Sequence, residues 1–199
     1  MRNLTATLCL TLAVLLGSAG VSVSQDFQVG LDAARKGDFA TALREWTPLA
    51  EQGDDAAQFN LGLMYRNGLG VLQDYKTAMK WFTLAAEQGV ADAQTSLGVM
   101  YYNGRGVPPD YATAAKWYTL AAEQGVAHAQ FNLGVMYNQG EGVMQDDVYA
   151  HMWGNIAASN GNEDGGWLRD MVAEQMTLSQ IQEAQTHARE CVRKNYIGC

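Results

Sequence analysis

The sequence predicts an all-α fold made of stacked αα-hairpins. A segment of 36 residues occurs three times, and in every copy glycines separate two segments whose apolar residues recur at helical spacing. Repeats of about 20 to 50 residues are typical of solenoids and related arrays. A single hairpin cannot bury its own apolar face, so we expect the copies to stack around a continuous core.

The first helix of each copy carries apolar residues at i, i+4, i+7 and i+8, which places them on one face. These positions are Ala57, Leu61, Met64 and Tyr65, then Ala93, Leu97, Met100 and Tyr101, then Ala129, Leu133, Met136 and Tyr137. A glycine follows each core leucine, at positions 62, 98 and 134. Because glycine inside a helix costs about 1 kcal/mol relative to alanine, we expect close contact there with the backbone of a neighbouring helix.

The boundaries of the two helices are also predicted by residue type. Gly68 and Gly70 follow the first helix of the first copy, where a left-handed conformation ends a helix. Asp74 stands where an N-cap residue belongs, before a second helix whose apolar face includes Tyr75 and Trp81. Trp81 and its equivalents Trp117 and Trp153 are expected to fill the space beside paired alanines.

Degenerate segments flank the three clear copies. We predict an N-terminal capping half-repeat over residues 25–55, repeats over 56–91, 92–127 and 128–163, and C-terminal capping helices over 164–199. After Gly161 the period fails, and residues 162–166 are expected to form a loop. A short helix over 167–175 and a final helix over 178–194 should follow, the latter opened by a capping box of Thr177 and Gln180.

The first 24 residues have the composition of a secretory signal peptide. Arg2 precedes an apolar run over residues 8–16 and then small residues, which predicts cleavage before Gln25 or, as the alternative, after Ala19. A membrane anchor is the competing interpretation, since no charge occurs between Arg2 and Asp26. Threonine, serine and glycine dilute the apolar run and favour the signal peptide, so we expect a periplasmic or secreted protein without a membrane span after cleavage.

The balance of charge limits the classes of partner. The chain carries a formal net charge of −8. An acidic surface repels phosphate backbones and anionic lipids, so nucleic acid and membrane surfaces are poor candidate partners.

The cysteines predict a disulfide. Cys9 leaves with the signal peptide, and Cys191 and Cys199 remain as a pair in a chain bound for an oxidising compartment. The bridge closes a short loop and should add at most about 2 to 3 kcal/mol. A metal site is the alternative, because Glu183 and His187 share a helix face with Cys191. Three ligands at this spacing on a straight helix span about 12 Å, too far for one ion, so we predict no metal.

No catalytic constellation or cofactor motif is evident. A serine β-lactamase would need Ser-x-x-Lys, and no serine here has a lysine at that spacing. His128 takes the repeat position of Asp92, and His151 that of Met79 and Ala115, which suggests surface or packing roles. Asp146 and Asp147 lack the ligand spacing of a calcium loop.

A row of variable positions on the first helices is the predicted partner-binding surface. It comprises Phe59, Leu63 and Arg66, then Thr95, Val99 and Tyr102, then Phe131, Val135 and Asn138. Core positions stay fixed between copies while these differ, as expected if each copy offers different contacts. For the apolar members, packing against the next hairpin is an equally open interpretation.

The fixed residues resemble those of a known repeat. The pattern Ala-x-x-x-Leu-Gly-x-Met-Tyr-x-x-Gly-x-Gly-Val-x-x-Asp-Tyr stands at residues 57–75 and 93–111, and again at 129–147 with Asp147 in place of the tyrosine. It is similar to the Sel1-like repeat of secreted bacterial proteins, a relative of the tetratricopeptide repeat. The resemblance implies a right-handed α-solenoid whose concave surface is lined by the first helix of each pair.

The function that the resemblance implies is that of an adaptor. We therefore expect a non-enzymatic scaffold, exported to the envelope of a Gram-negative bacterium, that binds a protein or peptide. The alternative is a hydrolase of β-lactams or peptidoglycan fragments, as described for a cysteine-rich secreted branch of the family. That branch has paired cysteines within its repeats, whereas these repeats contain none. Structural self-association is a third interpretation.

Overall fold

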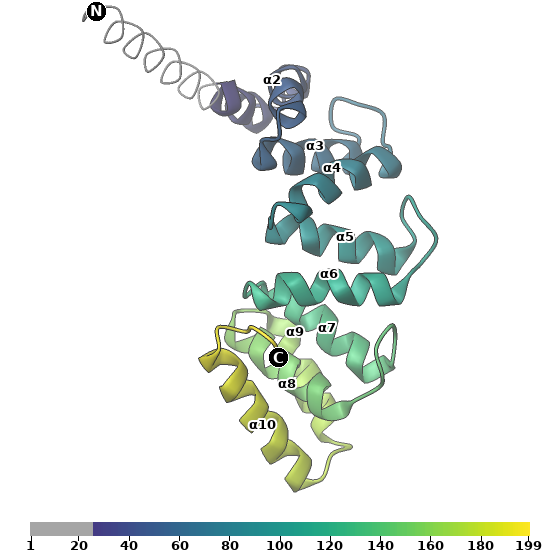
Figure 1. The fold of residues 1–199 in the computed structure, drawn as a ribbon, viewed down its shortest axis with the longest axis vertical. Helices are drawn as coiled ribbons and strands as arrows, with labels where there is room; N and C mark the ends of the chain where they lie inside the picture. The colour runs from purple at the N-terminus through teal and green to yellow at the C-terminus, as the bar shows by residue number, and fades with distance from the viewer. Residues whose placement is uncertain (1–25) are drawn as a thin grey trace, which may run out of the picture. The chain divides into compact units, whose positions relative to one another are not determined.

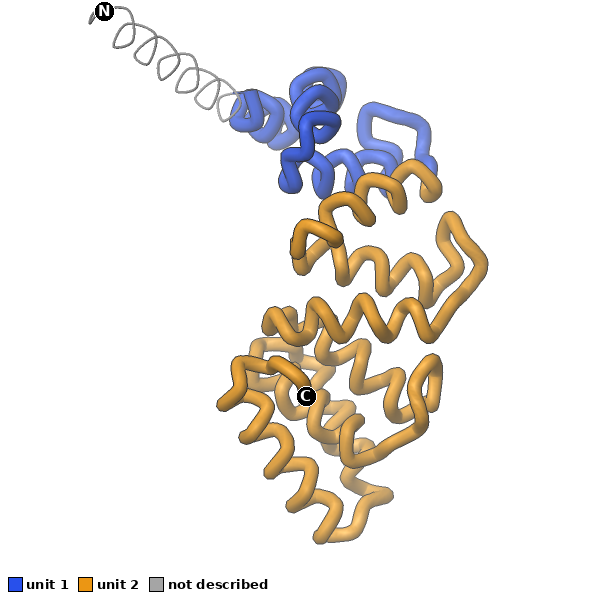
Figure 2. The backbone as a smooth tube through the Cα atoms, in the orientation of Figure 1, with its two compact units in different colours: residues 1–74 blue, residues 75–199 orange. Residues whose placement is uncertain are grey.

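The computed structural model describes residues 26–199 and divides into two compact units, one ending at Asp74 and one formed by Tyr75–Cys199 (Figure 2). Every regular element within residues 26–199 is a helix (Figure 1), so the predicted all-α class is confirmed. The predicted signal peptide lies outside the described residues. Among the residues that are described, no helix is both long and apolar enough to cross a bilayer.

The first unit contains helical residues 26–35, α2 (Phe39–Glu51) and α3 (Asp55–Asn67). The side chain of Asp54 begins α3 by accepting a hydrogen bond from the backbone N–H of Ala57 at 2.7 Å. Gly68 ends α3 in the left-handed conformation that the sequence predicted.

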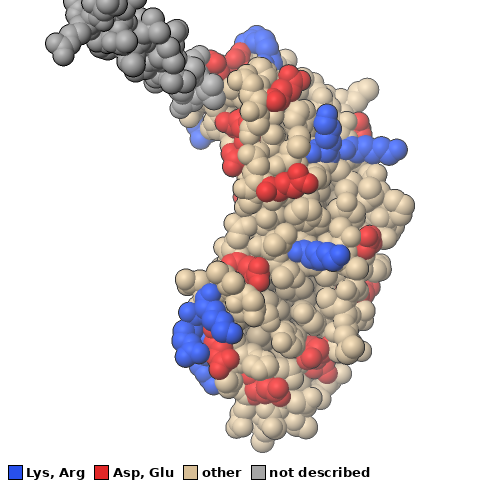
Figure 3. Space-filling model, viewed as in Figure 1, with Lys and Arg blue, Asp and Glu red and all other residues tan. Residues whose placement is uncertain are grey.

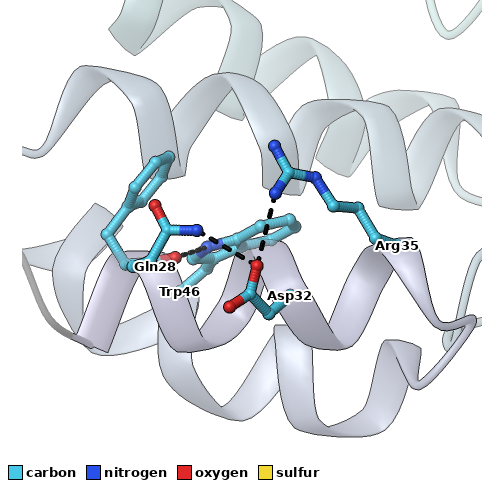
Figure 4. Close-up of polar contacts among 5 residues, drawn as sticks. Gln28, Asp32, Arg35 and Trp46 are labelled. Carbon is cyan, nitrogen blue, oxygen red and sulfur yellow. Dashed lines mark hydrogen bonds and ion pairs between the residues drawn. The ribbon is translucent and has the colours of Figure 1, made fainter.

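Side-chain contacts join the first helical segment to α2 (Figure 4). The indole Nε1 of the buried Trp46 donates to the carbonyl oxygen of Phe27 at 3.2 Å, and the two rings lie 6.0 Å apart. On the exposed side, Asp32 accepts hydrogen bonds from Gln28 at 3.1 Å and Arg35 at 3.3 Å. The tryptophan therefore fixes the helix over residues 26–35 against α2.

The second unit is a succession of antiparallel helices (Figure 1). They are α4 (Tyr75–Glu87), α5 (Ala91–Asn103), α6 (Tyr111–Glu123), α7 (Ala127–Gln139), α8 (Asp147–Ser159), α9 (Glu163–Ala173) and α10 (Leu178–Arg193). Asp110 and Asp146 cap α6 and α8, and Gly104 and Gly140 end α5 and α7 with φ of 66° and 70°. These caps agree with the prediction because they depend on residues only a few positions apart.

The core of the second unit differs from the prediction at its aromatic residues. Trp153 is buried as expected, but in the preceding copy Tyr118 is buried and Trp117 is partly exposed. A Cβ placed on Gly98 would lie 2.5 Å from Cε1 of Tyr118. The expectation of backbone contact is therefore wrong at Gly98: the missing side chain makes room for a tyrosine ring of α6.

The predicted loop over residues 162–166 is wrong, because α9 already begins at Glu163. Asn162 acts as its N-cap, accepting from the backbone N–H of Gly165 at 2.9 Å. A Cβ on Gly165 would lie 2.7 Å from the carbonyl oxygen of Gly154, so α8 and α9 cross where both lack side chains. Close packing of α9 on α8 outweighs the propensity cost of glycine inside a helix, which is about 1 kcal/mol.

The C-terminal segment folds back after α10. The capping box of Thr177 and Gln180 is present at the start of this helix, as predicted. Cys191, in the last turn of this helix, and Cys199, beyond its end, have their sulfur atoms within bonding distance of each other. The backbone N–H of Gly198 donates to Glu123 at 2.9 Å, which holds the chain end against the end of α6.

Candidate partner-binding site

The nine residues of the predicted row lie on three helices and are all partly exposed. Phe59, Leu63 and Arg66 belong to α3 in the first unit. In the second unit, α5 carries Thr95, Val99 and Tyr102, and α7 carries Phe131, Val135 and Asn138. The i, i+4, i+7 spacing places each set of three along one side of its helix.

The structure brings three members of the row together at one pocket. The pocket has a volume of about 210 Å³ and is lined by Tyr102, Tyr118, Phe131, Asn132 and Val135. It lies within the second unit, between α5, α6 and α7. Most of its wall is aromatic or aliphatic, and Asn132 adds one amide. Such a surface suits an apolar side chain next to a main-chain hydrogen-bonding group.

Polar and aromatic contacts hold the Tyr102 ring at this pocket. Its hydroxyl donates to Glu141 at 2.6 Å and reaches Gln139 at 3.3 Å, and its ring meets that of Tyr111 edge-on at 5.2 Å. The hydrogen bond to Glu141, with a smaller contribution from burial, raises the pKa of Tyr102 to about 12. The phenol therefore stays neutral at physiological pH and its ring remains oriented.

The apolar members of the row also touch the core. Val99 and Tyr102 pack against the cluster that contains Tyr118 and Leu133. Phe131 and Val135 pack against a second cluster, formed by Ala150, Leu168 and Val172. These side chains are packed on one side and exposed on the other. The row can therefore serve both in core packing and in partner binding.

Two lining residues, Tyr118 and Asn132, lie outside the predicted row. At the repeat position of Tyr118 the other copies have Phe82 and Gly154. This difference between the copies is the sequence signal that could have identified Tyr118 as a candidate. Asn132 stands beside Phe131 on α7, and within residues 26–199 its side-chain amide makes no hydrogen bond. That amide is available to a ligand.

The other residues considered for chemistry are dispersed. His128 is exposed, whereas His151 is buried in α8. Asp146 accepts from the backbone N–H groups of Val148 and Tyr149, which is the role of a helix cap. Among the described residues, no three histidine, cysteine or acidic side chains gather closely enough to hold a metal ion.

Comparisons with known proteins agree with this architecture. The model of the Sel1 repeat matches residues 55–90, 91–126 and 127–162. A Sel1 repeat protein from Oxalobacter formigenes is 40% identical, with a TM-score of 0.60 over 65% of this chain and 97% of that one. The search among curated proteins found no match.

A second solved structure extends the similarity over more of the chain. It is c5321, a protective antigen present in uropathogenic Escherichia coli strains that displays an SLR fold. The identity is 27% and the TM-score 0.54, over 87% of this chain and 47% of that one, so this chain spans about half of its length. Nothing in these similarities supports the hydrolase alternative. Because the repeat model matches more than half of its residues, the chain belongs to the Sel1 repeat family, whose members generally serve as scaffolds for protein interactions.

Proposed function

We propose that this chain is an exported, non-enzymatic scaffold that binds a protein or peptide through the predicted row on its first helices. The observation that carries the proposal is the pocket in which Tyr102 of one copy meets Phe131 and Val135 of the next. Because α5 and α7 belong to successive copies within the second unit, their variable residues line this pocket together.

The chemistry of the pocket defines the partner. Aromatic residues supply large contact areas at little entropic cost and are common at the centres of interfaces. We infer that an apolar side chain of the partner enters the pocket, while Asn132 bonds its main chain. The net charge of −8 favours a partner segment that is neutral or basic around this residue.

Site-specific photo-cross-linking in intact cells tests the proposal. A photoreactive residue placed at Asn138, in the row, should give an adduct with a partner, and the adduct should weaken when Phe131→Ala or Tyr102→Ala is added. A photoreactive residue at Trp167, which is 62% exposed but outside the row, is the matched control. Equal adducts at both positions, or an adduct that persists in both alanine variants, would contradict the proposal.

The first unit offers a second test of the row. Arg66→Ala should weaken partner binding without changing helicity, since Arg66 is partly exposed on α3. Circular dichroism provides the control: a loss of helicity would show that the side chain contributes to the core.

Export and the cysteine pair form a linked part of the proposal. A signal peptide over residues 1–24 would deliver Cys191 and Cys199 to an oxidising compartment, where a bridge between them would persist. Protein recovered from the periplasm should begin near Gln25 and contain no free thiol. Two reactive thiols without reductant would contradict the disulfide, and a retained N-terminus would contradict cleavage.

A further inference from the structure

A second pocket lies in the C-terminal part of the second unit, where α8 of the last copy meets the two helices that follow the repeats. It measures about 490 Å³ and is formed by α8, α9 and α10. Its lining residues are His151, Asn155, Arg169, Asp170, Ala173, Ile181, Gln185 and Arg189. None of them belongs to the predicted row, so its chemistry is independent of the partner-binding surface.

His151 is the unusual residue of this pocket. Its side chain is 3% exposed, and its buried Nδ1 has no hydrogen-bond partner within residues 26–199. The equivalent positions of the other copies hold Met79 and Ala115, so packing alone does not call for a polar group here. A buried polar atom without a hydrogen-bond partner destabilises the fold, and a ligand bonded to the imidazole would offset that cost.

Two arginines in the pocket wall have unused donors. Arg169 donates through Nε to Asp170 at 2.7 Å, and Arg189 donates through Nη2 to Thr186 at 3.0 Å. The remaining N–H groups of these guanidiniums donate to no protein group within the described part of the chain. On the face shown in Figure 3, basic side chains gather over the end of α10, the helix that carries Arg189.

The charge of the pocket points to a monoanion. Two arginines and one aspartate leave a net charge of +1 when the imidazole is neutral. Burial, and secondarily the charge of Arg169, lower the pKa of His151, so it is neutral at physiological pH and can donate one N–H. A phosphate dianion would exceed the available positive charge and would face the Asp170 carboxylate.

The remaining wall of the pocket selects among monoanions. Ala173 and Ile181 add an apolar side, and Asn155 and Gln185 add amides. The planar guanidinium matches a carboxylate, because two parallel N–H groups can bond its two oxygens. We propose that this pocket binds a carboxylate attached to a short apolar body, held by Arg169, Arg189 and His151. A free small carboxylate and the C-terminus of a peptide both present this chemistry.

Titration of the full chain with sodium butyrate, followed by NMR of the histidine rings, tests the proposal. Butyrate should shift the His151 imidazole signals saturably, and His151→Met serves to assign them. Arg169→Gln and Arg189→Gln should each weaken butyrate binding about tenfold, the expected loss for one charged hydrogen bond. Arg193→Gln, also on α10 but outside the pocket, is the matched control and should bind as the wild type does.

Other probes distinguish the two sources of carboxylate. The tripeptide Gly-Ala-Val is used with a free or an amidated C-terminus, and sodium phosphate is used as the competing anion. Tighter binding of the free tripeptide than of butyrate identifies a peptide C-terminus, and the reverse order identifies a small carboxylate. The proposal is overturned if butyrate gives no saturable shift, if phosphate binds as tightly, or if Arg193→Gln weakens binding as much as Arg169→Gln does.

Discussion

The pocket between α5, α6 and α7 and the pocket between α8, α9 and α10 are both formed by packed helices, but their walls differ in polarity. Between α5, α6 and α7 the wall is aromatic and aliphatic, with Tyr118 as its most buried member. Between α8, α9 and α10 the wall carries His151, Arg169 and Arg189. In the first case two successive copies supply the residues, whereas in the second α8 of the last copy supplies His151 and the two following helices supply both arginines. The repeats thus form the apolar pocket by themselves, whereas the charged side chains of the second pocket come from the helices that follow them.

The largest expected loss of stability is for a substitution at the centre of the apolar pocket. Tyr118→Ala removes a ring that is 3% exposed and leaves a cavity beside Gly98, so the free energy of unfolding should fall by about 3 to 5 kcal/mol. Tyr111→Ala, whose ring is 40% exposed, is the control and should cost about 1 kcal/mol. Urea unfolding measures both, and equal losses would show that Tyr118 is not a core residue.

A smaller effect is expected at the loop that packs behind Tyr111. Gly142 has a φ of +71°, and a Cβ on it would run into the carbonyl group of Tyr111, so Gly142→Ala should cost about 2 to 3 kcal/mol. Gly161 has a φ of +93° with open space around it, so Gly161→Ala should cost only about 1 kcal/mol. Thermal melting compares the two, and an equal loss would mean that contact with α6 is unimportant.

A substitution in the polar pocket should instead raise the free energy of unfolding. His151→Met restores the residue type of Met79 and removes a buried, unsatisfied Nδ1, so the free energy of unfolding should rise by about 1 kcal/mol at pH 7. A destabilised variant would show that the imidazole has a bonding role in the ligand-free fold.

His151 should also make the free energy of unfolding depend on pH. Burial lowers the pKa of His151 in the folded chain, while the unfolded chain titrates near 6.5, so below about pH 6.5 the unfolded state binds more protons. Stability should therefore fall as pH drops from 6.5 toward the folded pKa, and this part of the loss should vanish in His151→Met. A pH profile that stays the same in His151→Met would contradict this assignment.

The smallest effect is expected at the rim of the apolar pocket. Tyr102→Phe keeps the ring but removes the hydroxyl that donates to Glu141, so we expect a loss of about 0.5 to 1 kcal/mol and near-normal partner capture. Tyr111→Phe is the control, since the Tyr111 hydroxyl makes no hydrogen bond within residues 26–199. Partner capture lost in Tyr102→Phe but kept in Tyr111→Phe would show that the hydroxyl itself contacts the partner.

The sequence by itself determined the features that depend on near neighbours in the chain. The 36-residue period, the aspartates that cap α6 and α8, and the glycines that end α5 and α7 were all predicted. So was the capping box of Thr177 and Gln180. Each involves residues a few positions apart, where hydrogen bonds and allowed backbone angles follow directly from residue type.

The tertiary structure alone decided what depends on distant residues. The start of α9 at Glu163 depends on Gly165 lying against Gly154. This contact cannot be predicted from residue type. The repeat position of His151 predicts a surface or packing role, but only the packing of α9 and α10 against α8 places it at a pocket with two arginines. Likewise Tyr118 joins Tyr102 and Phe131 only because three helices meet. Helix propensity and periodicity describe one helix at a time, whereas pockets are formed by the side chains of several.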